Sequence, residues 1–340
     1  MFNGFFIDFK AYYVILIIEK VCGDFMKIVI LDKSTVSNGD LDFDCFNKFG
    51  EVTSYDFSYP EEIKDRIVDA DIIITNKCRL NEQNLKDSKV KLICLFATGY
   101  DNIDTKYCAN SGICVCNAPD YSTHSVAQHT FALILEFFSS VGEYAKSVSD
   151  GNWTYSKTFS YFLSSTHQLA GKTLGIIGYG SIGKQVAKIA TAFDMKILVN
   201  TRTNYNDTDS IKFVDLDYLL KNSDIITIHT PLTDETRNLI DEKAISKMKS
   251  TAYLINTSRG AVIDETSLAE ALRSHKIAGA GLDVIKTEPM QSDCKLRGLE
   301  NCIITPHIAW AGKEARERLL EIICDNINSY LNGSIINKVN

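Results

Sequence analysis

Residues 172–184 read KTLGIIGYGSIGK, a short apolar run followed by glycines at Gly178, Gly180 and Gly183. The spacing G-x-G-x-x-G directly after a predicted strand is typical of the phosphate turn in a dinucleotide-binding βαβ unit. Gly178 would allow the tight turn, and Gly180 would let the backbone approach a pyrophosphate. Gly183 would let the following helix pack against the strand.

The residues around these glycines support the interpretation. Residues 173–177 read as a buried strand, residues 181–193 carry apolar side chains at helical spacing, and residues 196–199 read as the next strand. The pyrophosphate would bind the free N–H groups at the start of the helix, at Ser181 and Ile182. A glycine turn with a purely structural role is the alternative.

Length and composition narrow the class of protein. A chain of 340 residues favours two domains, and 45% hydrophobic with 23% charged residues is ordinary globular composition. The net charge of −7 and the absence of a basic stripe argue against nucleic acid or an anionic membrane as partner. A small molecule is the expected ligand.

The cysteines and the first 25 residues bear on the cellular compartment of the protein. Ten cysteines lie mostly in apolar contexts without a C-x-x-C pair, which predicts buried free thiols, a reducing cytoplasm and no metal site. The apolar run at residues 11–18 is shorter than the roughly 20 residues that span a bilayer. Residues 1–25 also lack a basic start and a cleavage site, so we expect an upstream extension without function rather than a secretory signal.

From Lys27 onward, short apolar strands alternate with helical stretches, which predicts parallel sheets with right-handed crossovers. The expected strands of the first sheet are residues 28–31, 71–75, 91–96 and 113–116. Ligands of such sheets bind at the carboxyl ends of the strands, where polar loops follow at residues 76–77 and 97–102.

After these strands, residues 122–136 read as an apolar helix that carries His124 and His129, for which capping or core hydrogen bonding is favoured over ligand binding. Residues 313–331 are expected to form a helix that packs on the first domain. Six strands are expected in the second domain, the number in a full dinucleotide-binding sheet: residues 173–177, 196–199, 224–229, 252–257, 278–284 and 301–305.

Three ionisable residues follow strands of the second sheet: Arg259, Glu288 and His307. Each alone could be an ordinary loop residue, but strand ends at one edge of a parallel sheet converge on the nucleotide crevice. Together they suit carbonyl reduction with a nicotinamide hydride donor. Arg259 would hold a substrate carboxylate and polarise the adjacent carbonyl, His307 would donate the proton, and Glu288 would orient His307 and favour its protonated form.

From Lys27 onward the sequence resembles the D-isomer-specific 2-hydroxyacid dehydrogenases. The matching motifs are ATGYDNID at residues 97–104, GYGSIG at 178–183, HTPLT at 229–233, NTSRG at 256–260, GLDV at 281–284, EP at 288–289 and PH at 306–307. The resemblance implies two doubly wound α/β domains, a Rossmann cofactor domain at residues 125–308 inserted into a flavodoxin-like substrate domain at residues 26–124 plus 309–340. It also implies a homodimer formed through the cofactor domain.

The same resemblance implies roles for individual residues. Arg259, Glu288 and His307 would be the catalytic trio, and Asp283 would contact the nicotinamide carboxamide. Backbone groups around Gly99 would receive the substrate carboxylate. Further substrate contacts are implied for Asn76, Lys77, Thr98 and Arg259, and further cofactor contacts for Thr230, Pro231, Thr236, Thr257 and Ser258.

Within the family, the chain most resembles the glycerate dehydrogenase, or hydroxypyruvate reductase, branch, on residues 76–77, 97–99, 121–130 and 151–153. This implies reduction of hydroxypyruvate or glyoxylate to D-glycerate or glycolate. Glu288 argues against formate dehydrogenase, a relative with Gln at that place. The open alternatives are a dehydrogenase for a bulkier D-2-hydroxy acid, a phosphite-oxidising relative and a non-enzymatic nucleotide-sensing protein.

The chain departs from the usual pattern at the position that distinguishes NAD from NADP. An acid about 20 residues past the glycines normally binds the adenosine ribose and selects NAD. Here Thr201 stands roughly at that place and Arg202 follows it. A 2′-phosphate would meet no carboxylate and could pair with Arg202, so we expect NADP(H) to be accepted and slightly favoured over NAD(H).

Overall fold

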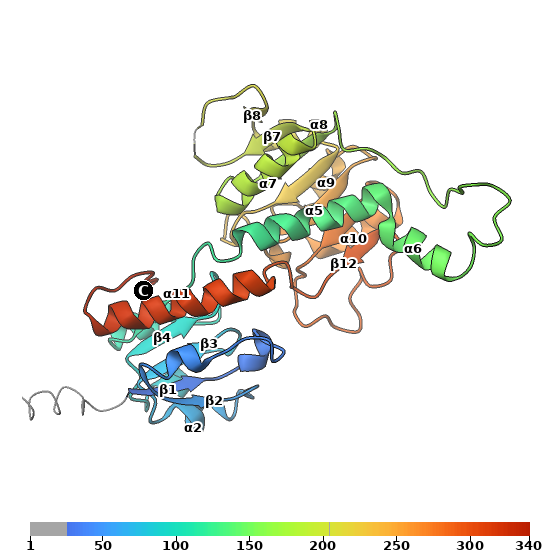
Figure 1. Ribbon diagram of the computed structural model, residues 1–340. Coiled ribbons are helices and arrows are strands. Elements are labelled where there is room, and N and C mark those ends of the chain that lie inside the picture. Colours follow the sequence, from blue (N-terminus) through green and yellow to red (C-terminus); the bar gives the residue numbers. More distant parts are fainter. Residues whose placement is uncertain (1–25, 204) are drawn as a thin grey trace, which may run out of the picture. The chain divides into compact units, whose positions relative to one another are not determined.

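The computed structural model describes residues 26–203 and 205–340, which divide into two compact units (Figure 1). Unit 1 contains residues 26–121 and 313–340, and unit 2 contains residues 122–312. The division differs by three and four residues from the expected boundaries after 124 and 308. At the second boundary, Ser125 Oγ donates to the Ala309 carbonyl (2.8 Å) and accepts from Gly312 N–H (3.2 Å), which ties residues 309–312 to unit 2. The expected extension at residues 1–25 lies outside the described residues.

Unit 1 contains a five-stranded parallel sheet in the order β2-β1-β3-β4-β5, the flavodoxin-like order. Its strands are β1 (Met26–Ile30), β2 (Gly50–Ser54), β3 (Ile72–Thr75), β4 (Leu92–Leu95) and β5 (Cys114–Cys116). Sequence patterning missed β2 because this edge strand, GEVTS, is largely exposed and has no apolar run.

Short helices connect these strands, and one long helix returns from the end of the chain. The connecting helices are η1 (Lys33–Thr35), η2 (Asp44–Phe46), α2 (Ile63–Ile67), α3 (Glu82–Leu85) and α4 (Thr105–Asn110). The long helix α11 (Lys313–Leu331) contacts β4 and η2 and buries Leu319, Ile323 and Ile327. The prediction that this helix packs on the first domain is confirmed.

Unit 2 contains seven parallel strands in the order β12-β11-β10-β9-β6-β7-β8. They are β6 (Thr173–Ile177), β7 (Lys196–Asn200), β8 (Ile211–Phe213), β9 (Ile225–Ile228), β10 (Tyr253–Asn256), β11 (Gly279–Leu282) and β12 (Cys302–Ile304). Counted from β6, this is the dinucleotide-binding order 3-2-1-4-5-6 with one strand added. The six predicted strands omitted β8, a three-residue edge strand that is only partly buried.

Helices cover both faces of this sheet. On one face, α5 (Thr123–Ser139) and α7 (Ser181–Ala192) share a core with β6 and β7 through Phe131, Ile134 and Val186. The helices α8 (Leu216–Asn222), α9 (Glu242–Ser246) and α10 (Glu265–Arg273) form the core of the other face. Two further helices are α6 (Val141–Ser149) and η3 (Gly260–Val262). Within the described ranges, no helix combines the length and apolarity that a membrane span requires.

Candidate active site of unit 2

The glycine turn between β6 and α7 has the geometry of a phosphate site. Gly178 has φ +95°, and a Cβ there would lie 2.6 Å from the His229 carbonyl oxygen. A Cβ at Gly183 would lie 2.2 Å from the Gly178 carbonyl, so close packing of helix on strand excludes any side chain. A Cβ at Gly180 would meet no described atom within 4 Å. Packing therefore requires two of the glycines, while Gly180 keeps the backbone at the start of α7 open to a ligand.

Unpaired polar atoms lie beside this turn. Both ring nitrogens of His229 and the hydroxyl of Thr230 are buried without a hydrogen-bond partner among the described residues. Burial lowers the pKa of His229 to about 3, so its ring is neutral at pH 7. Because buried polar groups are almost always paired in proteins, these atoms fit a bound polar ligand. Thr230 was predicted as a cofactor contact, whereas His229 was seen only as part of the HTPLT motif.

In the turn after β9, two residues predicted to contact the cofactor, Pro231 and Thr236, are hydrogen-bonded to each other. Thr236 Oγ1 donates to the Pro231 carbonyl (2.7 Å) and accepts from Thr233 N–H (2.7 Å). Thr233 also donates to Glu235 (2.6 Å), and this hydrogen bond, with a smaller contribution from the charge of Arg202, lowers the pKa of Glu235. Arg202 is thus close enough to this turn to act on it electrostatically.

The loop after β10 is organised by Asn256, a buried residue that sequence reasoning did not single out. Its Oδ1 accepts from both the backbone N–H and the hydroxyl of Ser258 (2.9 Å each), and its Nδ2 donates to the Arg259 carbonyl (2.9 Å). Thr257 is buried, with its hydroxyl 3.2 Å from that of Thr130 on α5. The only sequence signal for Asn256 was the NTSRG motif, because its role depends on its side chain facing its own loop.

Glu288 and His307 are in direct contact. His307 Nδ1 lies 2.6 Å from Glu288 Oε2, and Glu288 Oε1 accepts from Ile285 N–H (3.1 Å). With Glu288 ionised, Nδ1 donates and Nε2 is left at the far end of the ring. The two side chains are 26% and 34% exposed, so a substrate can reach them.

Backbone packing brings the Arg259 loop to the same place. A Cβ at Gly260 would lie within 2.0 Å of the Ile285 backbone, the residue whose N–H binds Glu288. Arg259 itself is half-buried, and its Nη1 donates to the Ser258 carbonyl (2.9 Å). Because β10, β11 and β12 are neighbours, the loops carrying the three predicted catalytic residues leave one edge of the sheet.

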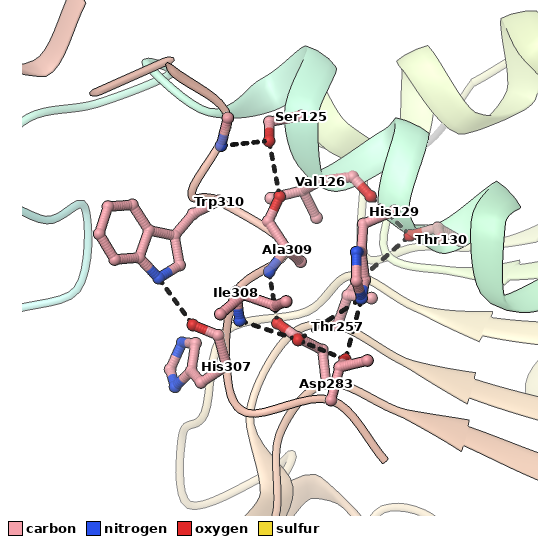
Figure 2. Close-up of polar contacts among 12 residues, drawn as sticks. Ser125, Val126, His129, Thr130, Thr257, Asp283, His307, Ile308, Ala309 and Trp310 are labelled. Carbon is pink, nitrogen blue, oxygen red and sulfur yellow. Dashed lines mark hydrogen bonds and ion pairs between the residues drawn. The ribbon is translucent and has the colours of Figure 1, made fainter. Parts of the chain in front are cut away.

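Asp283 follows β11 and is 1% exposed. Its carboxylate accepts hydrogen bonds from the Ile308 and Ala309 N–H groups, which follow His307 (Figure 2). It also accepts from the hydroxyl of Thr305, which precedes His307. Nearby, His129 Nε2 lies 2.9 Å from Thr305 Oγ1, which confirms the expected core hydrogen bonding, while His124 is exposed. Among the described residues, no group of three or more His, Cys, Asp or Glu side chains is arranged to hold a metal ion.

The predicted substrate residues of unit 1 lie in loops that are held by hydrogen bonds. Asp32, which sequence reasoning missed, is buried and accepts from the backbone N–H groups of Asn76 (2.9 Å) and Lys77 (2.6 Å). The Asn76 side chain is buried and donates to Thr35 (3.1 Å), whereas Lys77 is exposed. Thr98 Oγ1 donates to the Ala118 carbonyl (2.7 Å), and the adjacent Gly99 is half-exposed.

Known proteins share this sequence and fold. Residues 131–309 match the family model described as D-isomer specific 2-hydroxyacid dehydrogenase, NAD binding domain. The hydroxypyruvate reductase of Blautia hydrogenotrophica is 41% identical over 321 residues, 93% of this chain and 100% of the relative. The glycerate dehydrogenase of Methylorubrum extorquens is 39% identical over 317 residues, 92% of this chain and 98% of the relative.

A solved structure agrees with these relatives. An acyclic imino acid reductase in complex with NADPH and D-Arg is 34% identical, with a TM-score of 0.81 over 93% of this chain and 100% of that one. The family model, the relatives and the solved structure therefore agree with one another. The chain belongs to the D-isomer specific 2-hydroxyacid dehydrogenase family.

Proposed function

We propose that this protein reduces hydroxypyruvate or glyoxylate to D-glycerate or glycolate with a nicotinamide cofactor. The observation that carries the proposal is the 2.6 Å contact between His307 Nδ1 and Glu288 Oε2, next to the Arg259 loop. This pair is a proton donor with its own orienting carboxylate, which reduction of a ketone or aldehyde requires. The substrates come from the relatives named hydroxypyruvate reductase and glycerate dehydrogenase.

In the proposed mechanism, the guanidinium of Arg259 binds the substrate carboxylate and polarises the carbonyl next to it. The nicotinamide, when bound, supplies the hydride. His307 delivers its Nε2 proton to the carbonyl oxygen, and Glu288 holds the ring by Nδ1. In unit 1, the backbone around Gly99 is proposed to bind the substrate carboxylate, with further contacts from Asn76, Lys77 and Thr98.

The cofactor is proposed to bind along the edge of the unit 2 sheet. Its pyrophosphate would lie on the turn from Gly178 to Gly183, against the N–H groups of Ser181 and Ile182. Asp283 would contact the carboxamide with the acceptor capacity left by its three internal hydrogen bonds. Further contacts are proposed from Thr230, Pro231, Thr236, Thr257 and Ser258.

NADP(H) is proposed to be accepted and slightly favoured. Arg202 is exposed directly after β7, and the preceding Thr201 offers no carboxylate to repel a 2′-phosphate. A related solved structure contains NADPH. Both observations support acceptance of NADP(H). NAD(H) is proposed to be accepted as the alternative cofactor.

A matrix of initial rates tests the function. Hydroxypyruvate, glyoxylate and bulkier 2-oxo acids are each measured with NADH and NADPH, and phosphite is measured with NAD⁺ and NADP⁺. We expect the highest kcat/KM with hydroxypyruvate or glyoxylate. A preference for a bulkier acid, phosphite-dependent cofactor reduction, ammonia-dependent turnover, or tight nucleotide binding without turnover would each replace the proposal.

A homodimer is proposed on the basis of an exposed apolar surface in unit 2. The helix α6 and the loop after it project from the rest of this unit (Figure 1). On them Tyr155, Phe159 and Phe162 are 86%, 93% and 85% exposed, and Val141 is 65% exposed. Several exposed large apolar residues on one projecting segment are typical of a protein interface.

The nine cysteines in the described ranges are free, which supports a reducing compartment such as the cytoplasm.

Light scattering after size-exclusion chromatography tests the dimer. We expect a dimer mass for the parental chain and a monomer mass for the double substitution Phe159→Ser with Phe162→Ser. The control is Tyr218→Ser, because Tyr218 is a 50% exposed aromatic residue on α8, away from this surface. A monomeric parental chain would exclude the dimer.

A further inference from the structure

His307 has an unusual backbone conformation for a residue with a side chain. Its φ is +54°, in the left-handed region that few residues other than glycine adopt, histidine, asparagine and aspartate being the most frequent among them. Such a conformation persists where the surroundings hold it, and it sets the direction in which the ring leaves the backbone. The contacts that hold residues 305–309 therefore decide where the proposed proton donor lies.

Asp283 makes most of these contacts. Its carbonyl accepts from His307 N–H (2.8 Å), its Oδ1 from Ile308 N–H (2.9 Å) and its Oδ2 from Ala309 N–H (2.8 Å). Three consecutive backbone N–H groups thus bind one residue. Because Asp283 is 1% exposed, water does not compete for these bonds.

Thr305 links Asp283 to a histidine far away in the sequence. Thr305 Oγ1 lies 2.6 Å from Asp283 Oδ1 and 2.9 Å from His129 Nε2. A hydroxyl has a single proton, and the carboxylate can only accept, so Thr305 donates to Asp283 and accepts from His129. This network assigns the Nε2–H form to His129, whose Nε2 also lies 3.6 Å from Asp283 Oδ1.

The helix that carries His129 also holds the far end of the loop. Ser125, one turn earlier on α5, donates to the Ala309 carbonyl (2.8 Å), and Trp310 Nε1 donates to the His307 carbonyl (2.8 Å), as Figure 2 shows. The α5 helix is packed in the core of unit 2 through Phe131 and Ile134. It therefore offers a rigid support for both sides of His307.

We propose that His129, acting through Thr305 and Asp283, is a positioning residue that fixes the His307 loop for proton delivery. His129 partly compensates the buried carboxylate, and the aligned Thr305 hydroxyl keeps Asp283 oriented toward the three N–H groups. The proposal rests on the proposed role of His307 as proton donor. It assigns His129 and Thr305 to the rate of the chemical step and not to the binding of substrate or cofactor.

Two pairs of substitutions test the proposal. Thr305→Val removes the bridging hydroxyl at nearly constant volume, and Thr305→Ser retains it. His129→Leu removes the donor, and His129→Gln retains an N–H near the position of Nε2. We expect kcat to fall about 10- to 100-fold in Thr305→Val and His129→Leu, as for misplacement of a catalytic group. We expect recovery to within a few-fold of parental kcat in Thr305→Ser and His129→Gln.

The KM for hydroxypyruvate and the Kd for NADPH should stay within about twofold in all four variants. The control is His124→Leu, because His124 is an exposed histidine on the same helix, and this variant should retain parental kinetics. Thermal unfolding checks each fold. If Thr305→Val does not fold, the His129 pair decides, since it leaves the bond between Thr305 and Asp283 in place.

Measurement of His307→Asn in parallel separates this inference from the proposed function. Parental turnover in His307→Asn would remove the proton-donor assignment itself. An inactive His307→Asn with parental kcat in Thr305→Val and His129→Leu would remove only the positioning role. Equal loss in the conservative and the disruptive member of each pair, or loss of cofactor binding along with kcat, would indicate general structural damage and also overturn it.

Discussion

Asp32 in unit 1 and Asp283 in unit 2 do the same structural task in two different sheets. Each is 1% exposed and lies within two residues of the end of a strand. Asp32 accepts from the Thr75 hydroxyl (3.1 Å) and from N–H groups of residues 76–78, while Asp283 accepts from the Thr305 hydroxyl (2.6 Å) and from N–H groups of residues 308–309. A buried carboxylate thus orders the loop after a neighbouring strand in both units.

The difference lies in what the ordered loop carries. The loop at Asp32 presents Asn76 and Lys77, which are proposed to contact the substrate. The loop at Asp283 presents His307, whose φ is +54°. Of the two aspartates, Asp283 is the one with a histidine beside its carboxylate among the described residues, His129 Nε2 at 3.6 Å. In the proposed mechanism, the same arrangement would support substrate binding in unit 1 and proton transfer in unit 2.

The largest effect is expected from His307→Ala, which removes the imidazole proposed as the proton donor. Turnover of hydroxypyruvate should fall by about 10²- to 10⁴-fold, the usual contribution of a general acid. The Kd for NADPH, measured by fluorescence titration, should be unchanged, since the glycine turn is untouched. Parental turnover in this variant would show that the loop at Asp283 does not carry the proton donor.

The two carboxylates can be compared directly with Asp32→Asn and Asp283→Asn. Each amide replaces a charged acceptor that binds several donors, so urea unfolding should show a loss of about 2 to 3 kcal/mol in both variants. Kinetics should then separate them. We expect Asp32→Asn to raise the KM for hydroxypyruvate and Asp283→Asn to lower kcat; the reverse assignment would contradict the proposed division of tasks.

Acid should destabilise unit 2 through His229, a residue of the turn after β9. Burial lowers the pKa of His229 from its ordinary value of 6.5 to about 3. The unfolded chain therefore binds a proton below pH 6.5 that the folded chain does not. Stability from this group is complete above pH 6.5 and is lost as pH falls toward 3, at up to about 1.4 kcal/mol per pH unit.

Urea unfolding at pH 7, 6 and 5 measures this loss, which should reach about 2 kcal/mol at pH 5. His229→Gln has no group that titrates in this range, and its stability should depend less on pH. His124→Gln is the matched control, because His124 is exposed and should leave the pH dependence as in the parental chain. An equal slope in His229→Gln would show that His229 does not cause the acid sensitivity.

The smallest effect is expected at the loop after β7, which lacks a buried acid like Asp32 or Asp283. That strand ends at Asn200, whose Nδ2 donates to the Val214 carbonyl (3.0 Å), and Thr201 and Arg202 follow. Arg202→Ala should raise the KM for NADPH by about tenfold, the value of one charge-assisted contact, and leave the KM for NADH unchanged. Equal changes with both cofactors would remove the 2′-phosphate contact.

Much of the fold was predictable because the deciding interactions are local. The glycine turn lies within residues 178–183, and the steric limits at Gly178 and Gly183 come from neighbouring backbone. The apolar strands and the C-terminal helix were also predictable from the sequence. The strands β2 and β8 were missed because an edge strand is half-solvated and needs no apolar pattern.

The sequence by itself determined the class of chemistry, through the residue types at Arg259, Glu288 and His307 and through their place after strands of one sheet. Only the tertiary structure decided how these residues are held. Asp32 reaches residues 44 to 46 positions away, and His129 meets Thr305 across 176 positions. Hydrogen bonds over such separations leave no periodicity in the chain, because they depend on which strand ends the sheet order makes neighbours.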